Sequence, residues 1–150
     1  MHPRQLVETC DARDSGWGAR VTAGAPHTHV VLLVEDYDDF REALTLLIED
    51  LGPRVVTARN GRDALEQLCA GLRPCLILLD MMMPVMDGIS FRRAQLADAR
   101  LARIPVVMIS VTGLQYEDEA RDLGIETFLR KPFPPEELAS LLAHHCGSVA

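Results

Sequence analysis

The chain has 150 residues, of which 48% are hydrophobic and 25% charged, with a net charge of −7. This composition indicates one globular domain with a core, and the negative charge argues against a nucleic-acid-binding surface. No apolar run approaches the roughly 18 residues that span a membrane, and the start of the chain lacks the apolar segment of a signal peptide.

The first part of the chain differs from the rest. Residues 1–28 contain glycines and prolines without an apolar period, so we expect a flexible N-terminal tail. From Val30 to Val34 the residues are all apolar, which predicts a buried strand, and Glu35-Asp36 follows it. Apolar residues then recur from Phe40 to Leu51 with helical spacing, and Gly52-Pro53 ends this predicted helix.

A second strand and helix lead to the most informative stretch. We expect a short edge strand over 54–58 and a helix from Asn60-Gly61 to about Leu72. The apolar run 75–79 then predicts a strand buried on both faces, and it ends in Asp80. Pro84 and Asp87-Gly88 mark a loop and the start of a helix.

The remaining chain repeats the alternation of strand and helix. The helix after Gly88 carries Arg92-Arg93, which we expect on a solvated face. Later elements are predicted at 104–109 (strand, followed by Ser110), about 114–123 (helix), 126–129 (strand, followed by Arg130-Lys131-Pro132) and from Pro135 (helix).

Strands therefore alternate with helices five times, which predicts an α/β fold with an open, doubly wound parallel sheet. We expect one domain over 29–146, with short tails at 1–28 and 147–150.

Reactive side chains follow the predicted strands. Ligands of such sheets bind beyond the carboxyl ends of the strands, where Glu35, Asp36, Asp80, Ser110 and Lys131 would meet. Neighbouring carboxylates repel unless a cation intervenes, and Mg²⁺ prefers oxygen ligands. A lysine and a hydroxyl beside them suit a phosphoryl group, with Asp80 as the nucleophile.

Four motifs resemble one family, the response-regulator receiver domains of two-component signalling. They are Val-Glu-Asp at 34–36, Leu-Leu-Asp-Met-Met-Met-Pro-Val-Met-Asp-Gly at 78–88, Ile-Ser at 109–110 and Lys-Pro-Phe at 131–133. The resemblance covers about residues 29–146 and implies a flavodoxin-like sheet with strand order 2-1-3-4-5. It also implies phosphorylation of Asp80 by a histidine kinase or a phosphohistidine protein.

The resemblance also assigns roles to single residues. Asp36 and Asp80 would bind Mg²⁺ through their side chains, Met82 through its carbonyl and Glu35 through water. Lys131 would contact the phosphoryl group, and Ser110 would close onto it. Phe128 stands at the position of an aromatic switch residue that is often Tyr, and Phe cannot form its hydrogen bond.

Further expectations follow from the resemblance to receiver domains. We predict a cis Lys131–Pro132 bond, and signalling through the fourth helix, fifth strand and fifth helix, a face that could also form a homodimer. Met82 and Val111 stand where smaller or polar residues are common, so we predict a long-lived phosphorylated state.

Two other classes of function are weighed. A phosphatase of the haloacid dehalogenase type also uses an aspartyl nucleophile, but it needs a second acid where this chain has Met82. A pseudo-receiver would lack an acid or the lysine, and all are present. We therefore expect a phosphoacceptor that is no enzyme beyond Mg²⁺-dependent self-phosphorylation and slow self-dephosphorylation.

The surroundings of the protein are predicted as follows. The four cysteines form no C-x-x-C pair, and Cys69 and Cys75 lie in apolar stretches, so we expect free thiols and a cytoplasmic location. No output domain follows Ala150, so we expect a stand-alone receiver that contacts an unknown downstream protein or relays its phosphoryl group onward. We expect neither direct contact with nucleic acid nor insertion into a membrane.

Overall fold

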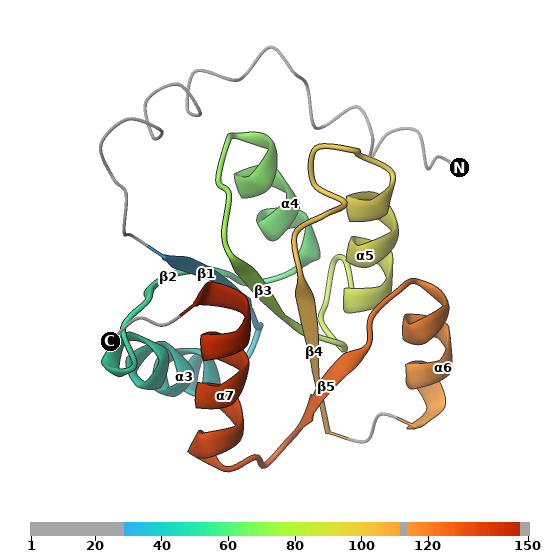
Figure 1. Cartoon of the computed structure of the whole chain (residues 1–150). Helices are drawn as coiled ribbons and strands as arrows, with labels where there is room; N and C mark the ends of the chain where they lie inside the picture. Colours follow the sequence, from blue (N-terminus) through green and yellow to red (C-terminus); the bar gives the residue numbers. More distant parts are fainter. Residues whose placement is uncertain (1–28, 112–113, 148–150) are drawn as a thin grey trace.

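Five parallel strands form one sheet in the computed structural model, which describes residues 29–111 and 114–147. The strand order is β2-β1-β3-β4-β5, so the predicted flavodoxin-like fold is confirmed (Figure 1). The expected tail at 1–28 lies outside the described residues, as do residues 148–150 of the expected tail at 147–150. The strands are β1 (Val30–Val34), β2 (Arg54–Ala58), β3 (Leu76–Asp80), β4 (Val106–Ser110) and β5 (Thr127–Arg130).

Helices cover both faces of this sheet (Figure 1). Helices α3 and α7 lie on one face and α4, α5 and α6 on the other, as each right-handed crossover requires. None of the described helices is long and apolar enough to cross a membrane. Their bounds are α3 (Asp38–Asp50), α4 (Gly61–Cys69), α5 (Gly88–Leu96), α6 (Leu114–Asp122) and α7 (Pro135–Cys146).

The continuous apolar runs have a direct structural reason. Alternate residues of a strand point to opposite faces. Leu32 and Val34 therefore pack into the core under α4 and α5, whereas Val31 and Leu33 pack under α3 and α7. Because both faces are covered, neither set of positions can be polar.

The register of the strands positions the reactive ends. Val34 pairs with Leu79, so Glu35 and Asp80 are the next residues along neighbouring strands. Ser110 pairs with Arg130, which places Lys131 directly beyond the end of β4. The sheet thus gathers at one edge side chains that lie up to 96 residues apart in the sequence.

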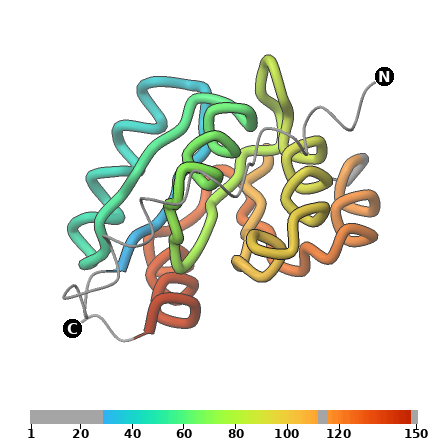
Figure 2. Tube along the Cα trace, turned by 90° about the horizontal axis from the view of Figure 1, so that it is seen from above, coloured from blue at the N-terminus to red at the C-terminus, as the bar shows by residue number. Residues whose placement is uncertain are grey.

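The turn after β3 depends on a glycine. The N–H of Gly88 donates to the carbonyl of Met81 at 2.9 Å, so the chain curls back tightly onto the strand end. A Cβ atom at residue 88 would lie 2.7 Å from the carbonyl oxygen of Asp80, too close for any other residue type. Asp87 then caps α5 by accepting from the N–H of Ser90. Figure 2 shows this loop, in yellow-green, projecting beyond the sheet.

The expectation that Arg92 and Arg93 both lie on a solvated face is wrong for Arg92. Arg92 is buried, because its guanidinium donates to the carbonyl of Leu123 and to the side chain of Gln95. Only Arg93 lies on the solvated face. The apolar helical pattern does not reveal such a partner, since Leu123 lies 31 residues further along the chain.

The expectation of free thiols is also wrong. Cys75 and Cys146 form a disulfide, and Cys69 is disulfide-bonded as well. The fold brings the residue just before β3 beside the end of α7, with Cα atoms 5.4 Å apart, although 71 residues separate them in the sequence. The predicted cis bond between Lys131 and Pro132 is present.

Candidate functional site

Three carboxylates meet beyond the ends of β1 and β3. Glu35, Asp36 and Asp80 each offer an oxygen, and these oxygens lie within 4.8 Å of one another. Glu35 and Asp80 are buried, whereas Asp36 is exposed to solvent. Oxygens of this number and spacing suit a hard divalent cation, so the chemistry of the donor set fits Mg²⁺.

Lys131 places one positive charge beside these carboxylates. Its Nζ lies 3.2 Å from Oε1 of Glu35 and 3.9 Å from Oδ1 of Asp80. The backbone N–H of Lys131 donates to the carbonyl of Ser110, which holds the end of β5 against β4. The lysine is therefore a fixed cation beside two buried acids and within reach of an anion attached to Asp80.

The protonation of Asp80 reflects this crowding. Burial, together with the neighbouring charge of Glu35, raises the pKa of Asp80 to about 7. Lys131 opposes the shift without cancelling it. A carboxyl group in this condition is poorly solvated and lacks enough positive charge, which is the situation that a bound cation relieves.

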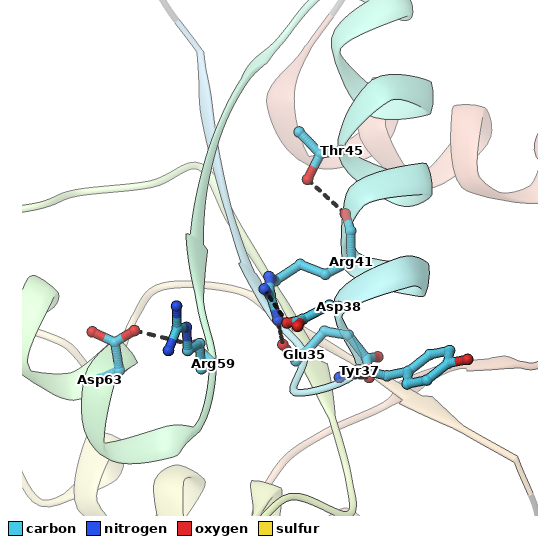
Figure 3. A network of polar contacts seen from close by, with 7 residues as sticks. All are labelled: Glu35, Tyr37, Asp38, Arg41, Thr45, Arg59 and Asp63. Atoms are coloured by element: carbon cyan, nitrogen blue, oxygen red, sulfur yellow. Dashed lines mark hydrogen bonds and ion pairs between the residues drawn. The ribbon is translucent and has the colours of Figure 1, made fainter.

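The loop after β1 is held by a network that the sequence analysis missed (Figure 3). Arg41 reaches back from α3 and donates to the backbone carbonyl of Glu35 at 2.9 Å and to the carboxylate of Asp38. The N–H of Tyr37 donates to Oε2 of Glu35 at 3.1 Å. The sequence shows only that Arg41 lies on an amphipathic helix six residues after Glu35. This spacing does not indicate that the arginine turns back to the loop.

The site lies in an open cavity of about 350 Å³. The cavity is lined by the five reactive residues of the sequence analysis, Glu35, Asp36, Asp80, Ser110 and Lys131. The side chains of Met82 and Val111 also line it and are 60% and 67% exposed. Two aromatic residues at the same cavity, Tyr37 and Tyr116, were not predicted.

Phe128, the expected switch residue, is not among the cavity-lining residues. It is half-buried on β5, and the guanidinium of Arg121 lies 5.1 Å from the centre of its ring. The neighbouring Arg130 forms an ion pair with the buried Glu117 of α6 at 2.6 Å. Phe128 therefore belongs to the contact between α6 and β5, one layer away from the reactive groups.

The chain also resembles curated proteins along most of its length. Response regulator Rre1 of Synechocystis sp. is 35% identical over 114 residues, which are 75% of this chain and 49% of that protein. The phosphate regulon transcriptional regulatory protein PhoB of Klebsiella pneumoniae is 37% identical over 73% of this chain and 48% of its own length. The chain thus spans about half of these relatives, but 87% of protein PilG of Pseudomonas aeruginosa, with 32% identity over 79% of the chain.

Solved structures share the fold. The receiver domain of a sensor histidine kinase from Pseudomonas aeruginosa, solved with magnesium in its active-site cleft, has a TM-score of 0.73 and 30% identity, covering 81% of this chain and 99% of that one. A chemotaxis protein of Vibrio cholerae has a TM-score of 0.71 and 31% identity, covering 79% of this chain and 98% of that one. The family model described as response regulator receiver domain matches residues 31–143, and the chain belongs to this family of two-component signalling modules.

Proposed function

We propose that this receiver accepts a phosphoryl group on Asp80 and that the modified domain changes its contact with another protein. Receiver domains take phosphoryl groups from histidine kinases, and we propose such a kinase or a phosphohistidine protein as the donor. The observation that supports this best is the position of Asp80, buried at the end of β3 within 4.8 Å of Glu35 and Asp36.

In the proposed step, a carboxylate oxygen of Asp80 attacks phosphorus. The new oxygen–phosphorus bond forms as the phosphorus–nitrogen bond of the phosphohistidine breaks, and the imidazole leaves. Lys131 then contacts the phosphoryl oxygens, because its Nζ is only 3.9 Å from Asp80. The hydroxyl of Ser110 donates a hydrogen bond to the same oxygens from the end of β4, and Phe128 responds on β5.

Mg²⁺ is the proposed cofactor. We propose that the side chains of Asp36 and Asp80 and the carbonyl of Met82 bind the ion, with Glu35 acting through water. The bound ion would neutralise charge that develops on the transferred group. Arg41 and the N–H of Tyr37 support the proposal, since Arg41 holds the backbone carbonyl of Glu35 and the Tyr37 N–H holds its carboxylate.

The remaining parts of the proposal concern the whole domain. We propose residues 29–146 as the receiver and the α6–β5–α7 face as its signalling surface, open to a homodimer contact. We propose the cytoplasm as its location, where a histidine kinase meets ATP. The expected free thiols were one argument for the cytoplasm, and the Cys75–Cys146 disulfide removes it. The proposed location therefore depends only on where the phosphoryl donor is found.

The test is labelling with acetyl phosphate and Mg²⁺, followed by intact mass. Wild type should gain one phosphoryl group and Asp80→Asn none. Asp87→Asn is the matched control, because it removes an acid from the same loop while an Asn still caps α5, and it should be labelled.

Other outcomes identify the competing functions. Equal labelling of Asp80→Asn contradicts the site. Failure of wild type to bind beryllofluoride indicates a pseudo-receiver. Rapid turnover of phosphate esters by wild type indicates a phosphatase of the haloacid dehalogenase type.

A further inference from the structure

The ammonium group of Lys131 rests against an aromatic ring. Its Nζ lies 4.3 Å from the centre of the ring of Phe40, within the range of a cation–π contact. Phe40 stands in the first turn of α3, directly before the Arg41 that holds Glu35. Phe40 is half-buried and packs on the core under α3 and α7.

A second ring sets the orientation of the first. Phe133 meets Phe40 edge to face, with ring centres 6.4 Å apart and an angle of 85° between the planes. Phe133 lies two residues after Lys131, so one short segment supplies both the cation and the ring that supports Phe40. Such edge-to-face pairs are stable in proteins, so Phe40 presents its face in a defined direction.

A lysine needs this kind of support. Its side chain is flexible, and ordering it costs conformational entropy. Glu35 attracts the ammonium, but a carboxylate alone would draw it away from Asp80, since Oε1 of Glu35 is 3.2 Å away and Oδ1 of Asp80 3.9 Å. The ring gives the ammonium a further contact that does not compete for its hydrogen bonds to an anion.

We propose that Phe40 is a positioning residue that holds Lys131 ready for the phosphoryl group on Asp80. This inference rests on the function proposed above. The ring acts through the lysine and touches neither the cation site nor the reacting atoms. Its loss should therefore weaken binding of the anion while affinity for Mg²⁺ alone changes little.

The test compares Phe40→Leu, Phe40→Tyr and the control Leu47→Ala. Leucine keeps apolar bulk without a π face, and tyrosine restores the face. Leu47 lies on the same helix and packs on the same core, so Leu47→Ala reports a loss of packing alone. Titration measures the affinity for beryllofluoride at saturating Mg²⁺ and the affinity for Mg²⁺ without the anion. NMR measures the chemical shift of the assigned Lys131 ε-methylene protons.

Phe40→Leu should lose roughly threefold to thirtyfold in beryllofluoride affinity, the range of a cation–π contact. Phe40→Tyr should recover most of it, and Mg²⁺ affinity should stay within about twofold in all variants. The Lys131 ε-methylene should be shifted upfield in wild type and Phe40→Tyr, but not in Phe40→Leu.

Three results overturn the inference. One is equal beryllofluoride affinity of Phe40→Leu and wild type. Another is an equal loss in Leu47→Ala. The third is an unshifted ε-methylene in wild type, which decides the matter even if Phe40→Leu does not fold. If wild type itself fails to bind beryllofluoride, the proposed function fails, whereas the ε-methylene shift still shows whether Phe40 holds Lys131.

Discussion

Asp80 is the residue at which folding and function conflict. Burial and the charge of Glu35 raise its pKa from 3.8 to about 7. Between about pH 4 and pH 7 the folded protein therefore keeps a proton that the unfolded chain has lost. The contribution of Asp80 to stability is therefore fully present below about pH 4, the pKa in the unfolded chain, and is lost as the pH rises through about 7, the pKa in the folded protein.

We predict that Asp80→Asn is more stable than wild type at pH 7.5 in EDTA and that the difference disappears toward pH 4. Asn fits the same space without a charge to bury. Thermal unfolding of both proteins across this pH range measures the difference. Saturating Mg²⁺ should stabilise wild type far more than the variant, and a pH-independent difference would contradict the prediction.

Met82 and Val111 concern the lifetime of the phosphorylated state. Both are mostly exposed, and both line the cavity above Asp80. Hydrolysis of an acyl phosphate needs a water in line with the bond to phosphorus, and apolar side chains at the mouth give that water no strong partner.

We predict that Met82→Asn and Val111→Ala each shorten the phosphorylated lifetime. A change of about 1.4 kcal/mol in the barrier corresponds to a factor of ten in rate. Decay after removal of acetyl phosphate, followed by intact mass, gives the rates of wild type, both variants and the double variant. Leu46→Ala, an exposed apolar residue on α3 away from the cavity, is the control and should decay like wild type. Unchanged decay in all variants would show that these side chains do not gate water.

At the scale of elements, α6 and β5 are connected to the site through short contacts. The N–H of Lys131 donates to the carbonyl of Ser110, and Arg130 pairs with the buried Glu117 of α6. The guanidinium of Arg121 covers Phe128 and lies 3.5 Å from the same Glu117. A displacement of Ser110 or Lys131 toward a phosphoryl group would therefore pull on the contact between α6 and β5.

We predict that beryllofluoride changes amide hydrogen exchange most between about residues 110 and 135. The physical reason is a shift in population between two arrangements of this contact. Mass spectrometry measures amide hydrogen exchange along the chain with and without beryllofluoride. The exchange of Asp80→Asn should not change when the anion is added. A change confined to α4 and α5 would place the response on another face.

At the scale of the whole molecule, the Cys75–Cys146 disulfide ties α7 to the sheet at the end remote from Asp80. The bond joins Cys75, which directly precedes β3, to Cys146 at the end of α7, and the Cys75 sulfur also lies 3.3 Å from the carbonyl oxygen of Val30 in β1. It closes a loop of 71 residues, so its main effect is to restrict the unfolded chain.

We predict that the double variant Cys75→Ala/Cys146→Ala loses about 2–4 kcal/mol of stability relative to the oxidised wild type, the usual range for such a bond. Denaturant unfolding with and without reductant measures this loss. Reductant opens the Cys75–Cys146 bond of wild type, so it should reduce the difference in stability between the two proteins. Cys69 is disulfide-bonded in both proteins, so reduction at that residue affects them alike. Equal stability without reductant would contradict the prediction.

The sequence alone determined the sheet and its reactive edge, because both depend on local order. Short continuous apolar runs bounded by turn residues favour strands covered on both faces, and the residue after each such strand lies at its carboxyl end. Glu35, Asp36, Asp80, Ser110 and Lys131 could therefore be placed together from their positions alone. The sequence also indicated the helix starts, through Asp87-Gly88 and Asn60-Gly61.

Only the tertiary structure decided the contacts between residues far apart in the chain. The disulfide, the burial of Arg92, the support of Glu35 by Arg41 and the ring of Phe40 beside Lys131 each depend on how helices pack against the sheet. An amphipathic period shows which face of a helix is buried, but not which atom it meets there, because packing is set by the partner surface and not by the helix itself.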